Sequence, residues 1–209
     1  MGRLDLQKCI VGSVFTNCYF LKNKETGEML IIDPGDNAEK IEQKILEMQG
    51  KPVAILLTHG HFDHATGAGE LAQLLHIKIY AQEKEKETLE NPQLNLSGWQ
   101  GSELVFYADE YLKDEQEIDL AGFHIRVFLT PGHTVGGCCY YFPYQNTLFS
   151  GDSLFQTSIG RTDFPKGSAS QLIHAIREKL MPLPDETAVY TGHGDMTTIG
   201  TERMYNPYL

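Results

Sequence analysis

Short apolar runs separated by polar turns organise the first part of the chain. Residues 8–14 and 17–21 are rich in β-branched and aromatic side chains and predict two strands, and residues 29–32 predict the next hairpin arm. Apolar positions at helical spacing follow this arm and predict a helix. Asp36 with Glu39 predicts a capping box at the start of that helix.

A strand–helix–strand unit comes next. Residues 53–57 form a continuous apolar run, residues 67–75 have helical periodicity, and residues 77–80 predict another strand. The charged residues 83–90 interrupt this pattern, and we expect them to form a solvated face. The loop after them holds Trp99, the only tryptophan of the chain. We expect Trp99 either to line a substrate pocket or, as is more common for such a residue, to anchor the loop.

The second half of the chain repeats the plan of strands followed by a helix. Strands are predicted at residues 117–120, 123–129, 138–142, 147–149 and 187–190. Ser168 and Gln171 predict a second capping box, which opens a helix that reaches Leu180. This order favours an α/β (α+β) fold in which two mixed β-sheets pack face to face with helices outside. Because no linker composition interrupts the chain, residues 1–209 are predicted to form one catalytic domain.

The chain is acidic, with 17 Lys and Arg against 28 Asp and Glu and a net charge of −11. A field of this sign repels polyanions, so we expect neither nucleic acid nor an anionic membrane as a partner. No apolar run approaches the length of a membrane span, and we expect no targeting segment at the N-terminus. The cysteines lack the paired spacing of a zinc–thiolate site or a disulfide scaffold. We therefore expect a cytoplasmic protein with reduced, mostly buried thiols at Cys9, Cys18, Cys138 and Cys139.

Four metal-competent side chains fall within six residues shortly after the apolar run at 53–57. They are His59, His61, Asp63 and His64. In an extended segment alternate residues point the same way, so the first three are predicted to face one side while the fourth turns away. Such a segment can serve two adjacent cations. Imidazole nitrogen with some carboxylate oxygen suits zinc, iron or manganese better than calcium, and the density of ligand types disfavours a metal-free polar turn.

Three later strands end in a similar way. Each apolar run is followed by a glycine and then a metal-capable side chain, at Gly132-His133, Gly151-Asp152 and Gly192-His193. Glycine allows a sharp turn and a close approach of the backbone to a bound group, and strand ends are rigid mounts for a site. The remaining histidines lie outside these motifs and are expected to be structural or exposed: His76, His124 and His174.

The complete inventory of five histidines and two aspartates fits two divalent cations, with zinc preferred and iron or manganese as alternatives. We predict a first site of His59, His61 and His133, a second site of Asp63, His64 and His193, and Asp152 as a bridge between cations about 3.5–4 Å apart. Asp63 and Asp152 are also assigned as catalytic residues. Sites with this ligand count keep a position for water, which zinc can ionise near pH 7 to give a metal-bound hydroxide.

These motifs carry a clear resemblance. The segment from His59 to His64, with Pro131-Gly132-His133-Thr134, Gly151-Asp152 and Gly192-His193-Gly194, resembles the full motif set of the metallo-β-lactamase superfamily. Asp33-Pro34-Gly35 resembles the Asp-Pro-Gly of the glyoxalase II branch, and residues 160–165 and 203–209 look like the short glyoxalase II-like (hydroxyacylglutathione hydrolase-like) hydrolases. The resemblance implies a four-layer αββα sandwich, the ligand assignment above and a hydrolase.

The same resemblance implies cleavage of a small hydroxyacyl thioester, since glyoxalase II acts on S-lactoylglutathione. Thioester hydrolysis is also chemically reasonable, because a thiol with a pKa near 8.5 can leave as a thiolate without a strong general acid. Arg161 falls where the longer enzymes of that branch have a basic glutathione contact, whereas Asp163 stands where they have a tyrosine. Arg161 is therefore either a contact for a substrate carboxylate or one half of a structural ion pair.

Two other functions stay open. The sequence also resembles the persulfide dioxygenase branch, which uses one iron and would take its ligands from the first histidines, His133 and Asp152. The flavodiiron oxidoreductases fit less well, because they have a glutamate at the position of His61. A metal-binding protein without catalysis is the third alternative, and an open-sided site makes it the least attractive.

Overall fold

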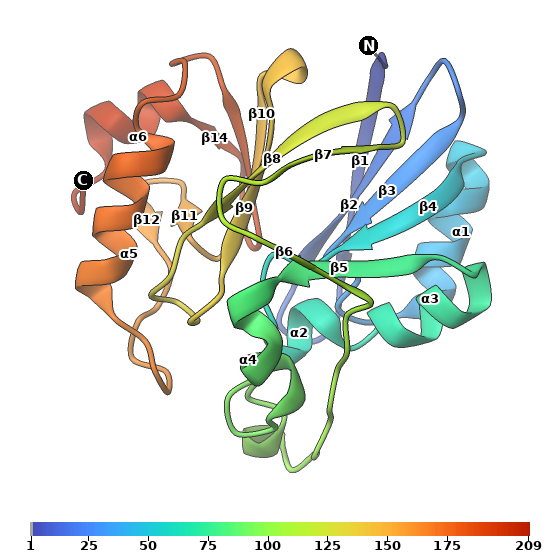
Figure 1. Cartoon of the computed structure of the whole chain (residues 1–209), viewed down its shortest axis with the longest axis horizontal. Coiled ribbons are helices and arrows are strands. Elements are labelled where there is room, and N and C mark those ends of the chain that lie inside the picture. Colours follow the sequence, from blue (N-terminus) through green and yellow to red (C-terminus); the bar gives the residue numbers. More distant parts are fainter. Residues whose placement is uncertain (1) are drawn as a thin grey trace.

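Two β-sheets pack face to face and helices cover the outer face of each (Figure 1). This four-layer αββα sandwich confirms the predicted fold, and it is described for residues 2–209 by a computed structural model. The first sheet has the order β1 (Leu4–Val11), β2 (Thr16–Asn23), β3 (Glu28–Ile32), β4 (Lys51–Leu56), β5 (Lys78–Gln82) and β6 (Glu110–Leu112). Its first three strands are antiparallel, and β3 to β6 run parallel to one another.

The second sheet is also mixed. Its order is β14 (Thr197–Thr198), β13 (Ala188–Thr191), β10 (Thr147–Gly151), β9 (Cys138–Phe142), β8 (Phe123–Leu129) and β7 (Glu117–Leu120). β10 and β13 are parallel, while β7 to β10 form an antiparallel meander. A small two-stranded ribbon, β11 (Leu154–Phe155) with β12 (Ser158–Ile159), lies beside this sheet.

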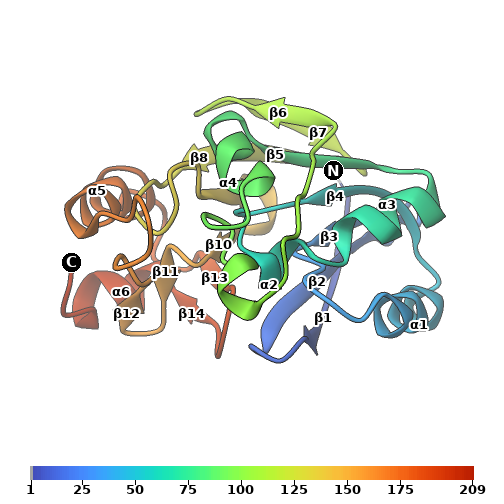
Figure 2. The same cartoon turned by 90° about the horizontal axis from the view of Figure 1, so that it is seen from below.

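Helices α1 (Ala38–Met48) and α3 (Ala68–Leu75) cover the first sheet, and α5 (Ala169–Ala175) and α6 (Ile199–Tyr205) cover the second (Figure 1). α5 continues as a turn of π-helix over Ile176–Leu180. The short helices α2 (Phe62–Ala65) and α4 (Lys86–Glu90) lie at the lower edge of the sandwich, between the two halves (Figure 2). Each helix of the described residues is too short or too polar to cross a membrane.

The alternation of side chains along β9 shows how the layers are held together. Cys138, Tyr140 and Phe142 point into the core between the sheets. Cys139 and Tyr141 point the other way, into the core under α5 and α6. All five are buried, because a strand covered on both faces is apolar throughout. The adjacent cysteines therefore serve core packing as predicted, and both are free thiols.

The two capping predictions have different outcomes. The Asp36–Glu39 capping box is wrong, because α1 begins at Ala38 after Asn37 in the left-handed conformation and no side chain caps it. The Oδ1 atom of Asp36 instead accepts a hydrogen bond from the Asn37 amide at 2.6 Å. For α5 the predicted cap is present, since the Ser168 hydroxyl accepts from the amide of Gln171 at 3.4 Å. The second bond of a capping box, from the Ser168 amide to the Gln171 side chain, is missing, because the Ser168 amide donates to the Gly132 carbonyl instead.

Candidate metal centre

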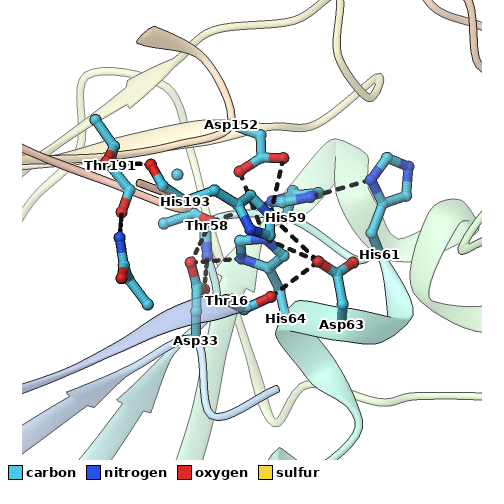
Figure 3. Close-up of polar contacts among 12 residues, drawn as sticks. Thr16, Asp33, Thr58, His59, His61, Asp63, His64, Asp152, Thr191 and His193 are labelled. Atoms are coloured by element: carbon cyan, nitrogen blue, oxygen red, sulfur yellow. Dashed lines mark hydrogen bonds and ion pairs between the residues drawn. The ribbon is translucent and has the colours of Figure 1, made fainter. Parts of the chain in front are cut away.

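The seven predicted ligands meet at one edge of the sandwich, just past the ends of four strands. Figure 3 labels all of them except His133. His59 follows β4, His133 follows β8, Asp152 follows β10 directly, and His193 follows β13. Both sheets thus contribute to the site, and the carboxyl ends of their strands hold it rigidly.

The ligand-rich segment itself is only partly extended. β4 ends at Leu56 and the backbone bends at Thr58. His61, itself in an extended conformation, acts as the N-cap of α2, and Asp63 lies in the first turn of that helix. The prediction that Asp63 alternates with His59 and His61 along a strand is therefore wrong. The amides of His64 and Ala65 both donate to the His61 carbonyl, at 3.0 and 3.1 Å, and this closes the helical turn. The turn places Asp63 and His64 on a helix and not on the extended strand, with the ring centroid of His64 only 4.1 Å from that of His59.

The first group of side chains consists of His59, His61 and His133, all buried. Nδ1 of His61 lies 3.1 Å from Nε2 of His59 and 2.9 Å from Nε2 of His133. The second group consists of Asp63, His64 and His193. There Nε2 of His64 lies 3.3 Å from Nε2 of His193, and Oδ2 of Asp63 lies 3.5 and 3.3 Å from these two nitrogens.

Asp152 lies close to members of both groups. Its Oδ1 is 3.4 Å from Nε2 of His64, and its Oδ2 is 3.5 Å from Nε2 of both His133 and His193. Within residues 2–209, the buried Oδ1 has no hydrogen-bond partner. Four ligands around a zinc ion lie roughly 3.3 Å from one another. The spacing and the unpaired oxygen therefore suit cation ligands, and the residues fit a pair of divalent cations.

The far sides of the imidazoles are held by other residues. Nδ1 of His64 lies 2.9 Å from Oδ2 of Asp33, and Nδ1 of His133 donates to the Arg161 carbonyl at 2.7 Å. The amide and hydroxyl of Thr58 donate to the same Asp33 carboxylate, at 2.8 and 2.6 Å. Contacts of this kind fix the ring orientation and leave the opposite nitrogen free to bind a metal.

Burial and charge act differently on the individual histidines. Burial, followed by the imidazoles of His64 and His61, holds the pKa of His59 well below its usual value of 6.5. Burial likewise lowers the pKa of His61 and of His133. These three rings are uncharged at neutral pH, which is the form that binds metal.

The surroundings of His64 are strongly negative. Burial lowers its pKa, but the carboxylates of Asp63, Asp33 and Asp152 outweigh this effect and raise the pKa to about 10. Burial alone would raise the pKa of Asp63, yet His64 and His193 reverse that and lower it. Three carboxylates around one buried point create a demand for positive charge that a divalent cation would satisfy.

A cleft of about 550 Å³ opens over the two groups. Its floor includes Asp63, Asp152 and His193, whose side chains are 12%, 12% and 25% exposed. Its walls are mostly apolar and aromatic: Val14, Phe62, Leu96, Trp99, Phe155, Ile159 and Phe164. Substrate would thus reach the polar floor between apolar walls, the usual composition of a small-molecule site.

The sequence model of the metallo-beta-lactamase superfamily matches residues 11–193. The chain belongs to this superfamily. It is 40% identical over 201 residues to the probable metallo-hydrolase YqgX of Bacillus subtilis, covering 95% of this chain and 94% of YqgX. It is also 40% identical over 197 residues to the hydroxyacylglutathione hydrolase GloC of Haemophilus influenzae, covering 92% of each. The chain is a metallo-hydrolase of the superfamily.

Solved structures agree with this assignment. The BLEG-1 B3 metallo-beta-lactamase superposes with a TM-score of 0.93 at 40% identity, covering 98% of this chain and 99% of that one. TTHA1623, in a di-iron-bound form, superposes with a TM-score of 0.84 at 33% identity, covering 97% and 100%.

Arg161 and Trp99 both line the cleft of this superfamily member. The guanidinium of Arg161 forms a bidentate pair with Asp163, at 2.9 and 2.7 Å, and lies 4.2 Å from the ring centre of Phe164. The ion pair anticipated for Arg161 is therefore present. Trp99 is 59% exposed, so it is a wall of the cleft and not a buried anchor of its loop. The other histidines lie outside the site: His76 and His174 are exposed, and His124 pairs with Asp119.

Several polar residues around the metal centre, Thr58 among them, were not among the predicted site residues. Asp33 could have been recognised, because it follows β3 as Asp152 follows β10. Thr16, whose hydroxyl donates to Oδ2 of Asp63 at 2.9 Å, gives no signal in the sequence. Glu85 belongs to the charged run that was expected to be a solvated face, but it is buried. That expectation is wrong at Glu85, Thr88 and Leu89, since this segment packs against the metal-site loops.

Proposed function

We propose that this protein is a dinuclear metal-dependent hydrolase that cleaves a small hydroxyacyl thioester. The observation that carries the proposal is the convergence of seven metal-capable side chains, Asp152 among them, beneath one cleft. In this proposal His59, His61 and His133 hold the first cation, and Asp63, His64 and His193 hold the second. Asp152 would contact both, because its Oδ2 lies near His133 of the first group and its Oδ1 near His64 of the second.

Zinc is the proposed metal, because three or four nitrogen and oxygen ligands at tetrahedral spacing suit it. Iron is the alternative, supported by the di-iron form of TTHA1623. When bound, such a cation pair lowers the pKa of water and polarises a carbonyl group. Asp63 and Asp152 are the carboxylates that face the cleft, and we assign them the catalytic role of orienting the attacking water.

The residues around the cleft favour a thioester over substrates with poorer leaving groups. Among the described residues that line the cleft, Arg161 is the one titratable residue outside the proposed metal ligands. Its guanidinium stays protonated. No lysine, tyrosine or cysteine is in place there to protonate a leaving group. A thiol departs as a thiolate near neutral pH and does not need such an acid. The similarity to GloC, named a hydroxyacylglutathione hydrolase, supports the same substrate class. Arg161, at the rim, is the proposed contact for a substrate carboxylate.

The direct test is hydrolysis of S-lactoylglutathione by protein loaded with zinc, followed as release of the thiol. We expect turnover that rises with added zinc up to two equivalents and falls more than about 100-fold in the Asp152→Ala variant. Asp119→Asn, which alters an exposed aspartate on β7, is the matched control and should keep full activity. Two parallel assays measure hydrolysis of a cephalosporin and, with iron-loaded protein, oxygen uptake in the presence of glutathione persulfide. Activity confined to either of these, without thioester hydrolysis, would contradict the proposal.

A further inference from the structure

Glu85 is a buried carboxylate that lies outside the seven ligands but close to them. It ends a short 3-10 turn (Glu83–Glu85) before α4, and only 1% of its surface is exposed. Burial of a carboxylate is costly unless several donors surround it. A residue of this kind is normally retained for a specific structural or functional reason.

The carboxylate of Glu85 joins two loops that are far apart in the sequence. Oε1 accepts from the Gly60 amide at 2.8 Å. Oε2 accepts from the Gly136 amide at 2.6 Å and from the hydroxyl of Thr134 at 3.0 Å. One side chain thus uses both oxygens to hold the loop after β4 and the loop after β8 at a fixed distance.

Glu85 contacts residues next to the first metal group and none next to the second. Gly60 lies between His59 and His61, and Thr134 directly follows His133, so each ligand of the first group is next to a residue bonded to Glu85. The second group is supported differently, with Asp33 on His64 and Thr16 on Asp63.

The backbone around Glu85 leaves little room for adjustment. A Cβ atom added at Gly136 would lie 2.1 Å from the amide nitrogen of Glu85 and 2.5 Å from the carbonyl carbon of Lys84. The loop after β8 therefore rests directly on the turn before α4, and only glycine permits this approach. The turn and the loop are in direct backbone contact, and the carboxylate links them to Gly60.

We infer that Glu85 is a positioning residue for the first cation. It sets the separation between the His59–His61 loop and the His133 loop, and thereby the geometry of the three nitrogens that would bind that cation. The inference rests on the proposed pair of cations, of which it addresses only one. It makes the charged segment before α4 part of the metal centre.

The test compares Glu85→Gln with Glu87→Gln, a neighbouring glutamate that is exposed and pairs with Lys166. An amide has one acceptor oxygen, and its NH₂ group would face the N–H of Gly60 or Gly136, donor against donor. Zinc affinity is measured by competition with a chromophoric chelator. We expect the dissociation constant of one cation to rise about 10- to 100-fold in Glu85→Gln, and that of the other to change less than about two-fold. Glu87→Gln should match the wild type.

Cobalt spectra identify the affected site. Co²⁺ absorption is recorded for Glu85→Gln and for two reference variants, His133→Ala in the first group and His193→Ala in the second. We expect the spectrum of Glu85→Gln to change in the same bands as that of His133→Ala. A purely structural role would alter both sites equally, so it would not produce this selective signature.

Thr134→Val provides a second route if Glu85→Gln fails to fold. It keeps the buried charge and both backbone bonds but removes one donor, and we expect the first cation to bind at least about three-fold more weakly. Equal weakening of both cations, or no change in either variant, would overturn the assignment of Glu85 while leaving the proposed hydrolase intact. A wild-type protein that binds fewer than two cations would overturn both.

Discussion

The five histidines of the centre do not present the same ring nitrogen to it. His61 faces the first group with Nδ1, whereas His59 and His133 face it with Nε2. His64 and His193 also approach each other through Nε2. His61 differs because a single residue, Gly60, separates it from His59, and the shorter reach of Nδ1 suits two ligands so close in the chain. Residue spacing predicts the ligand set, but the choice of atom depends on the backbone.

Removal of His193 should separate the two cations. We expect the His193→Ala variant to bind about one zinc per chain in place of two, because the first group keeps all its ligands. Elemental analysis after dialysis gives the ratio, and His124→Ala, which removes a histidine paired with Asp119 away from the site, is the control. A ratio that remains at two, or falls to zero, would show that the ligands are not divided in this way.

Asp163 should control how Arg161 meets an anionic substrate. The Asp163→Asn variant releases the guanidinium, so kcat/KM for S-lactoylglutathione should rise roughly two- to five-fold, the size expected of an exposed ion pair. A lactoyl thioester of an uncharged thiol should be hydrolysed at an unchanged rate by the same variant. Equal changes for both thioesters would mean that Arg161 does not contact a substrate carboxylate.

At the scale of elements, the sequence predicts the strands that carry the ligands more reliably than the short helices around them. The apolar runs before His59, His133, Asp152 and His193 are all strands, since a run buried on both faces has few alternatives. β6 and β14 were not predicted, because strands of two or three residues leave no periodic pattern. α6 was also not predicted, since its seven residues include Gly200.

The supporting residues depend on contacts distant in sequence. Glu85 stands in a run of charged residues, and nothing in that run distinguishes it from Glu83 or Glu87, which are exposed. Its burial results from the loop after β8, about fifty residues further along, reaching it through Thr134 and Gly136. Local patterns predict ligands grouped on one loop, but they do not show which distant loop covers a given side chain.

Gly132 joins the first metal group to α5, and its replacement should damage both. It has φ +134°, and an added Cβ would lie 2.4 Å from the Ser168 carbonyl oxygen and 2.6 Å from the Leu172 amide. We expect Gly132→Ala to reduce the free energy of unfolding by at least about 2 kcal/mol and to weaken zinc binding, because His133 is displaced. Urea unfolding of the metal-free protein and zinc titration measure the two effects.

Gly69 offers the matched control for that substitution. It lies in α3, and an added Cβ would meet no atom within 4 Å. Because Gly69 is the second residue of α3, Gly69→Ala should stabilise the protein by up to about 1 kcal/mol, with unchanged zinc affinity. If both glycine variants behaved alike, the contact between the His133 loop and α5 would not be important.

For the whole molecule, the metal centre joins two sheets of an acidic protein with a net charge of −11. Cations bound at this junction should stabilise the native state, because the ligands come together only when both sheets are in place. At a zinc concentration 100 times the dissociation constant, each cation contributes about 2.7 kcal/mol. For a chain of this length that raises the melting temperature by roughly 5–10 °C.

Thermal unfolding with zinc and with excess EDTA measures this difference. The Asp152→Ala variant, which lacks the residue shared by both groups, should show a much smaller shift. Equal melting temperatures with and without zinc in the unaltered protein would mean that the cations do not link the two halves.

The most direct measurement is anomalous diffraction from crystals of the zinc-loaded protein. The account predicts two peaks about 3.5–4 Å apart. One should be bound by His59, His61 and His133, the other by Asp63, His64 and His193, with Asp152 in contact with both. A single peak, or peaks bound by other side chains, would contradict it.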